Sequence, residues 1–334
     1  MDYLKMSLEV AKTIGQPLDI NHPVPVTLEL ICNTGTAEPG ERVRYFSNLD
    51  AEVDEIYTIA SDGSLHPYKV SPIQSAEVTF SSYTSLMDYI LLDEVINGIS
   101  GDAGKGNEDL EVFGRKKRAI TRALDKREVK SVLDGVMSAA TEVAIGSGSP
   151  DIYDYIVDCV QALEDYGDNY VLLVGSKVKN HMDVYDKVNA KGFNYRIGLA
   201  EYLKNAGITV KKIFGKLQTG TGAAAGAAPT SVTNAVFLDT NKLIMVAKNS
   251  TIVDGLPITF IRRKLGAALA GLMGVEVDTA QRAIGVGDAP TVVAGSNVLG
   301  FNIWAYESNC MVITNPKAIV KSPSLEAVLA VVAS

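Results

Sequence analysis

The sequence contains few of the residue types that build disulfide, metal and catalytic sites. Its 334 residues include only three cysteines and three histidines. Cys32, Cys159 and Cys310 are far apart and odd in number, so neither a disulfide framework nor a zinc-binding spacing is present. We therefore expect reduced thiols, as in cytosolic proteins. The histidines lie in different segments without a second ligand at helical spacing, and we predict no metal and no cofactor.

Long apolar runs are also absent. No run approaches the roughly 20 apolar residues that span a bilayer, and Met1–Lys5 does not begin a secretory signal. We expect a soluble protein without a membrane partner. The formal net charge of −8 argues against a protein whose main task is to neutralise nucleic acid, although a local basic patch is compatible with it.

Catalytic motifs are incomplete. The segment Gly101–Gly106 lacks the first glycine and the hydroxyl residue of a phosphate-binding loop, and no Gly-x-Ser-x-Gly elbow occurs. Gly175 and Ser176 follow an apolar strand, but such residues more often cap the next helix. We predict that the chain is not an enzyme. A soluble α/β enzyme, suggested by residues 150–214 alone, is kept as an alternative.

The first third of the chain is predicted to be mostly extended. Residues 1–14 have a weak helical pattern, and the prolines that follow predict an extended arm over 15–40. Apolar residues alternate from 41 to 80 around an Asp-Gly turn, which predicts an acidic β-hairpin. A hairpin with so few apolar side chains is marginal alone, so we expect it to pack on another subunit. Residues 85–96 follow a helical period and predict a helix.

A long helix is predicted over residues 107–143, with Asn107 as its N-cap. Its apolar stripe advances by five residues between Leu124 and Val129, so the stripe moves around the helix axis. We therefore expect this helix to change packing partners along its length. The run that contains Gly146, Gly148 and Pro150 follows it and predicts a hinge.

The second half alternates helices and strands after the hinge. Residues 170–174 are a continuous apolar run that predicts a buried strand. The Gly- and Ala-rich residues 215–233 predict a flexible loop, and 235–247 predict a pair of strands.

The closing segment carries a resemblance. Residues 297–314 read as an alternating strand, a small break and an apolar strand, and they precede Asn315-Pro316-Lys317-Ala318-Ile319-Val320-Lys321. This ending, together with the order of the elements, resembles the major capsid proteins of tailed bacteriophages across nearly the whole chain. The resemblance implies an α+β fold with an N-terminal arm, an extended β-hairpin loop, a peripheral domain with a long spine helix, and a central α/β domain.

The resemblance also implies domain boundaries. They are an N-terminal arm, 1–40; an extended hairpin, 41–76; a peripheral domain, 77–148 and 252–308, with its spine helix at 107–143; a central domain, 149–250 and 309–322; and a C-terminal tail, 323–334. We expect the apolar tail to pack on the shell.

The densest basic segment lies on the predicted spine helix. By the resemblance this helix faces the interior of a capsid, so its cations could meet packaged DNA or an acidic neighbouring subunit, and we favour the subunit. A solvated helix face is the alternative. The patch comprises Arg115, Lys116, Lys117, Arg118, Arg122, Lys126 and Arg127.

The implied function is a major capsid protein that self-assembles from pentamers and hexamers into an icosahedral virion shell around double-stranded DNA. Assembly in the host cytoplasm, with portal, scaffolding and decoration proteins as further partners, follows from the same resemblance. An encapsulin-type nanocompartment shell is the first alternative, because it would share the fold. It would need a hydrophobic pocket for a cargo peptide, which the sequence neither shows nor excludes.

Overall fold

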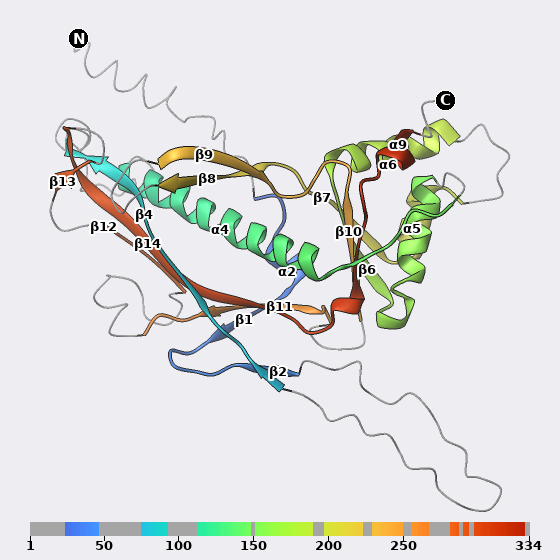
Figure 1. Cartoon of the computed structure of the whole chain (residues 1–334), viewed down its shortest axis with the longest axis horizontal. Helices are drawn as coiled ribbons and strands as arrows, with labels where there is room; N and C mark the ends of the chain where they lie inside the picture. The colour runs from blue at the N-terminus through green and yellow to red at the C-terminus, as the bar shows by residue number, and fades with distance from the viewer. Residues whose placement is uncertain are drawn as a thin grey trace, which may run out of the picture.

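The computed structural model describes residues 24–46, 75–92, 112–147, 151–189, 197–222, 229–249, 255–266, 281–286, 290–293 and 297–330. The two larger of the four sheets in these ranges occupy opposite halves of the molecule, and a long helix runs from one toward the other (Figure 1). The mixed α+β class predicted from the sequence is confirmed. Within the described ranges, no helix has both the length and the apolar character needed to cross a bilayer.

The peripheral sheet is built around β14 (Leu299–Ile313), a single strand of 15 residues. The predicted break within residues 297–314 was wrong: only a register shift at Ile303/Trp304 interrupts the pairing of β14 with β4. Antiparallel pairing on both edges holds this length of chain extended. Its antiparallel partners are β4 (Ser81–Leu91), β11 (Ile258–Arg263), β12 (Arg282–Val286) and β13 (Thr291–Val292), and β1 (Asn33–Ala37) pairs in parallel with β11.

Strand β4 corrects the helix predicted over residues 85–96. Residues 81–91 are extended and pair with Gly300–Asn309 of β14, and residues 93–96 lie outside the described part. Local apolar spacing favoured a helix, but pairing with a long neighbouring strand satisfies the backbone along the whole segment. Tertiary pairing of this kind overrides weak local preference.

The spine helix is α4 (Val112–Ala139). The predicted N-cap and residues 107–111 lie outside the described part. At the other end the prediction ran four residues too far. Residues 141–142 form β5, which pairs in parallel with β15 (Ile319–Lys321), and the Val143 amide donates to the Lys321 carbonyl at 3.0 Å.

The predicted change of packing partners along the spine helix is confirmed. In the N-terminal half Ile120 and Leu124 pack against Ile303 and Ala305 of β14. From Val129 onward the buried face of the helix packs into a second cluster that contains residues of both sheets. The five-residue step in the stripe therefore marks the point where the helix passes from one set of neighbours to the next.

The central sheet has the order β5-β15-β10-β6-β7, with β6 (Asn169–Val174) and β10 (Leu243–Lys248) inside it and β7 (Ile208–Lys212) at its edge. β6 is buried on both faces, as predicted from its apolar run. Leu172 packs on the helical side and Leu173 on the spine-helix side. The helical side comprises α5 (Ile152–Gln161), η3 (Glu164–Tyr166), α6 (Ser176–Asn189), α7 (Leu199–Asn205) and α9 (Glu326–Ala330).

Two end segments pack on this chain rather than away from it. Residues 24–37 were predicted as part of an extended arm, but they form α2 (Leu28–Ile31) and β1, and Val26 and Ile31 are buried in the cluster that contains residues of both sheets. The apolar character of these residues outweighs the local prolines. Leu325 and Val328 of the C-terminal tail are buried in the central core, and the packing of this tail on a shell stays a prediction. Residues 1–23 and 331–334 lie outside the described part.

A second hairpin replaces the flexible loop predicted over 215–233. Strands β8 (Lys216–Gly222) and β9 (Pro229–Val236) pair antiparallel and run beside α4 (Figure 1). Of the strand pair predicted over 235–247, the second strand is present as β10, but the predicted pairing was wrong, since β10 pairs with β6 and β15 rather than with β9. Alternating threonines and valines favour strands despite the intervening glycines.

The base of the extended hairpin is present as β2 (Arg44–Phe46) paired with β3 (Ser75–Glu77). Its outer part, residues 47–74, lies outside the described residues.

The last short element is η4 (Pro316–Ala318), where Asn315 Oδ1 accepts from the Lys317 amide at 3.0 Å. The Asn-Pro-Lys segment thus forms a capped turn directly before β15, which pairs in the central sheet.

Candidate functional site

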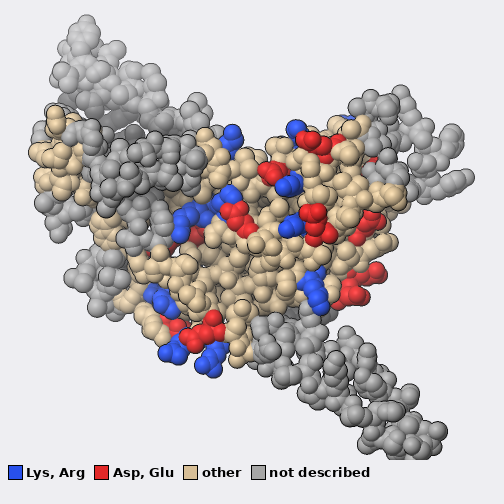
Figure 2. Space-filling view, in the orientation of Figure 1, with Lys and Arg blue, Asp and Glu red and all other residues tan. Residues whose placement is uncertain are grey.

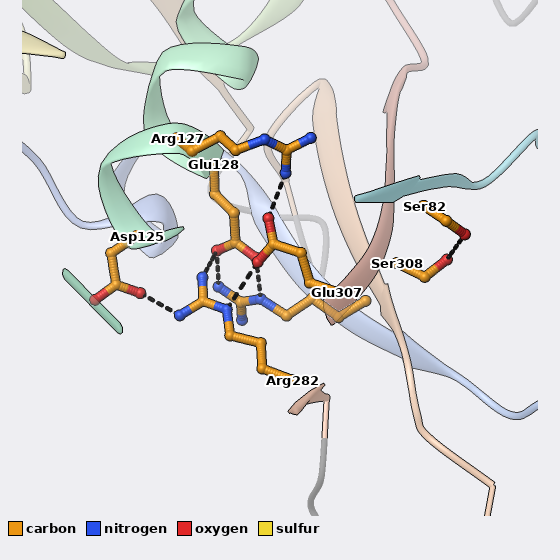
Figure 3. A network of polar contacts seen from close by, with 8 residues as sticks. Ser82, Asp125, Arg127, Glu128, Arg282, Glu307 and Ser308 are labelled. Atoms are coloured by element: carbon orange, nitrogen blue, oxygen red, sulfur yellow. Dashed lines mark hydrogen bonds and ion pairs between the residues drawn. The ribbon is translucent and has the colours of Figure 1, made fainter. Parts of the chain in front are cut away.

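Six charged side chains meet where the spine helix crosses the peripheral sheet (Figure 3). We call them the charge network. Three come from α4, one each from β11 and β12, and one from the middle of β14. They are Asp125, Arg127, Glu128, Arg262, Arg282 and Glu307.

Glu128 is the centre of the network, with 1% of its side chain exposed. Arg262 binds it with both arms of its guanidinium, Nε to Oε1 at 3.0 Å and Nη2 to Oε2 at 2.6 Å. Arg282 Nη2 lies 2.6 Å from the same Oε2 as an ion-pair contact outside hydrogen-bonding geometry. Two-armed contacts of this kind fix orientation as well as distance.

Glu307 is the second buried acid, with 2% of its side chain exposed. Arg282 donates from Nε to Glu307 Oε2 at 3.0 Å and from Nη1 to Asp125 Oδ1 at 2.5 Å. Arg127 donates from Nη1 to the other oxygen of Glu307. Arg282 therefore connects two residues of the spine helix with the central strand of the sheet.

Strand register explains why two arginines from distant parts of the chain meet here. Arg262 ends the pairing of β11 opposite Asn309, and Arg282 begins the pairing of β12 opposite Glu307. Asn309 also pairs with Ser81 of β4, so β4 and β11 occupy opposite edges of β14. β11 and β12 thus lie end to end along one edge, and the chain leaves the sheet beside Arg262 and returns beside Arg282.

The charges balance, because three arginines face three carboxylates. Burial, followed by the nearby Glu128 carboxylate, raises the pKa of Glu307, while Arg282 and Arg127 oppose that shift. Hydrogen bonding to Glu128 raises the pKa of Arg262. Buried ion pairs contribute little net stability compared with apolar side chains of similar size, but removal of one partner is strongly destabilising. We therefore expect the network to specify how helix and sheet are arranged more than it stabilises them.

Sequence analysis missed the network. Of the six residues, it singled out only Arg127, as part of the basic patch. A usable signal was present, because Glu128 continues the apolar stripe of Leu124, and Glu307 continues the inward positions of Ile303 and Ala305. A carboxylate at an inward position of an apolar element implies a buried cationic partner.

The structure separates the predicted basic patch. Arg115, Lys116 and Lys117 lie on α4, but their side chains are outside the described part. Arg118 is exposed, and Arg122 and Lys126 are half-buried. Arg127 instead turns toward its own sheet and pairs with Glu307. On the face shown in Figure 2, basic and acidic side chains are interspersed over the described part of the molecule.

Of Gly146, Gly148 and Pro150 in the predicted hinge, only Gly146 is described. It is exposed, and its φ is not in the left-handed region that would require glycine. Asp151, just beyond the hinge, accepts from the Asp154 amide at 2.9 Å and caps α5. Gly148 and Pro150 lie outside the described residues.

The strand end that an enzyme site would use is bonded within the chain. The amides of Gly175, Lys177 and Val178 donate to the carbonyls of Lys242 and Thr240. A Cβ on Gly175 would lie 2.1 Å from the Asp239 carbonyl oxygen, so the turn between β9 and β10 covers this end of β6. Among the described residues, no group of three His, Cys, Asp or Glu side chains is arranged to hold a metal ion.

Comparisons with known proteins give a match by structure only. No protein-family model matches the sequence, and no curated protein matches it. A chain from the capsid structure of the cyanophage P-SCSP1u is 11% identical to this chain, with a TM-score of 0.50 over 92% of this chain and 90% of that one. The chain has the major capsid protein fold of tailed bacteriophages.

Two further solved structures are similar to this chain. One is a phage-related protein from Bordetella bronchiseptica, with 9% identity, a TM-score of 0.49, and 96% of this chain and 97% of that one covered. The other is the SrpI encapsulin from Synechococcus elongatus, with 7% identity, a TM-score of 0.43, and 93% and 94% covered. The fold predicted from the closing strands is confirmed.

Proposed function

We propose that this chain is a major capsid protein that self-assembles into an icosahedral shell around double-stranded DNA. The observation that carries the proposal is the match to a phage capsid chain over 92% of this chain and 90% of that one. A match of that extent includes the spine helix and both sheets rather than one common motif. Portal, scaffolding and decoration proteins would be further partners, in a virion assembled in the host cytoplasm.

The mechanism is surface complementarity rather than catalysis. The base of the extended hairpin is a two-stranded ribbon that packs on the peripheral sheet, but a longer ribbon is marginal without further packing. In a shell the outer part of the hairpin would lie over a neighbouring copy and gain that packing. Flexibility at Gly146, Gly148 and Pro150 would let one sequence occupy the pentamer and hexamer positions.

Assembly of the purified full-length chain tests the proposal directly. We expect shells or capsomers by sedimentation and electron microscopy, and a stable monomer at high concentration would contradict the proposal.

Deletion of residues 48–72 should abolish shells while the central domain still folds, and intact shells from that variant would refute the role of the hairpin. Nuclease-protected DNA within shells formed in cells supports a virion, whereas shells that retain a protein cargo would identify an encapsulin-type compartment.

The basic patch has its own test. Replacement of Arg115, Lys116, Lys117 and Arg118 by glutamine should impair assembly or DNA retention, because four cations that face DNA or an acidic neighbour would be lost. A matched control removes four exposed lysines of the central domain, Lys177, Lys204, Lys211 and Lys248. Equal assembly and equal DNA retention by the two variants would mean that the patch is an ordinary solvated helix face.

A further inference from the structure

The end of β11 places two consecutive arginines on opposite faces of the peripheral sheet. Side chains alternate along a strand, so Arg262 and Arg263 must point to different faces. Arg262 shares its face with Phe260, whose ring centroid lies 5.4 Å from the guanidinium carbon, and binds Glu128 of the spine helix there. This face is the one that α4 covers.

The opposite face carries the base of the extended hairpin. The Arg263 guanidinium lies 4.0 Å from the centroid of the Phe80 ring, and its Nη2 reaches the Glu41 carbonyl at 3.5 Å. Ile261, on the same face, packs in a small apolar cluster with Val43, Val78 and Phe80. The Val78 amide donates to the Val43 carbonyl at 2.8 Å and closes the hairpin at this point.

The next residue extends the connection. Lys264 Nζ pairs with Glu38 Oε1 at 2.6 Å, and the Lys264 amide donates to the Ala37 carbonyl at 2.8 Å. Three consecutive residues of one strand end therefore hold the spine helix, the hairpin base and the chain that leads into the hairpin.

The position of Arg263 is costly for a residue whose only role is packing. Its Nε is buried without a hydrogen-bond partner among the described residues. A buried donor without a partner is destabilising, and an apolar side chain at this site would avoid that cost. What an arginine adds is a planar group that stacks on an aromatic ring in a defined orientation.

We propose that Arg262 and Arg263 form a coupling through the sheet that sets the direction of the extended hairpin relative to the spine helix. Arg262 fixes the strand end to the helix on one face, and Arg263 fixes the hairpin base to the same strand end on the other. A rotation of α4 on the sheet moves the hairpin with it. The consequence for assembly rests on the proposed function, because hairpin direction would decide which neighbouring copy the hairpin reaches.

Amide hydrogen exchange on the full-length chain tests the coupling. Arg262→Lys keeps the charge but loses the two-armed contact with Glu128. We expect exchange at Val78 and in β2 and β3 to rise about tenfold, as expected for the weakening of a charged hydrogen bond on the far face. Coupling between two sites is reciprocal. Arg263→Met should therefore raise exchange in the part of α4 that contains Glu128.

The control is Asp134→Asn, which removes the exposed Lys130–Asp134 pair from the same helix and should leave hairpin exchange unchanged. Amides of β6 serve as an internal reference. A rise confined to the substituted face overturns the proposal, and so does an equal rise in β6, which would indicate general loss of stability. If Arg263→Met does not fold, Arg263→Lys gives the same comparison. Exchange needs no shell, so a chain that does not assemble counts against the proposed function alone.

Discussion

Glu128 and Glu307 are the two buried acids of the described part of the chain, and each lies on an element that is otherwise apolar on that side. A buried carboxylate is stable only when cations and hydrogen bonds replace the water that it loses. The sequence shows such a residue as an interruption of an apolar stripe, so the existence of a partner is predictable. The identity of the partner is not, because Arg262 and Arg282 reach Glu128 through strand register that no local pattern records.

Three buried thiols give a prediction that depends on pH. Burial raises the pKa of Cys32 and of Cys159 to about 12, and that of Cys310 to about 11. The thiolate is the reactive form, and it forms only as pH rises toward these values. At pH 8 we expect alkylation of the folded protein to be at least about a hundredfold slower than that of an exposed cysteine. Mass spectrometry after timed treatment with iodoacetamide measures this.

The control for the thiol experiment is the same protein in guanidinium chloride, where all three cysteines should react at the rate of a cysteine peptide. Burial would be contradicted if any one of them reacted at the peptide rate in the native protein.

At the scale of elements, hydrophobic periodicity predicted which side chains of a segment are buried. It was less successful in predicting which segments pack or pair with one another. The five-residue step in the spine helix was sufficient to predict two sets of partners. The helix predicted over 85–96 was wrong, because β14 offers ten consecutive residues, Gly300–Asn309, as a pairing template. The loop predicted over 215–233 was wrong for a related reason, since a glycine-rich segment still forms a ladder when its other half is close in sequence.

The charge network predicts a non-additive effect on stability. Arg282→Met should lower the free energy of unfolding by about 3–5 kcal/mol, because Glu128 and Glu307 would stay buried with fewer cations. Simultaneous replacement of Glu128, Arg262, Arg282 and Glu307 by methionine should restore stability to within about 2 kcal/mol of the wild type. Urea denaturation followed by circular dichroism measures both.

Asp134→Asn is the matched control for the network, since it removes an exposed ion pair from the same helix and should change stability by less than about 1 kcal/mol. If the fourfold replacement lost as much stability as the four single replacements added together, the charges would act independently. In that case the network would be a set of separate pairs, and its role in fixing the helix on the sheet would be lost.

At the scale of the whole molecule, one core joins the parts that the sequence divides. Val132 of the spine helix, Leu173 and Ile244 of the central sheet, and Phe260 of the peripheral sheet belong to the same buried cluster. The domain boundaries stay a prediction, and the shared core is a finding. Apolar patterns in the sequence indicate which faces of an element are buried. They do not indicate whether two buried faces of different predicted domains pack against each other.

The far end of the peripheral sheet presents apolar side chains to solvent. Val292 and Leu299 face each other across the β13–β14 pair and are 60% and 43% exposed, and Val298 is 40% exposed. Apolar groups gathered at one exposed end of a molecule are typical of a contact surface. In a shell this end would be covered by another copy. We therefore expect the combined variant Val292→Ser and Leu299→Ser to raise the concentration needed for assembly by about tenfold or more.

Light scattering across a concentration series measures the effect of these tip substitutions. The melting temperature should change little, because exposed side chains away from structural features contribute little to the stability of the subunit. Val184→Ser is the control, since Val184 is 43% exposed on α6 at the other end of the molecule. Assembly of the tip variant at the wild-type concentration would show that the apolar end of β13 and β14 stays in solvent. Contacts between copies would then have to lie elsewhere, such as on the extended hairpin, the basic patch or the faces of the central domain.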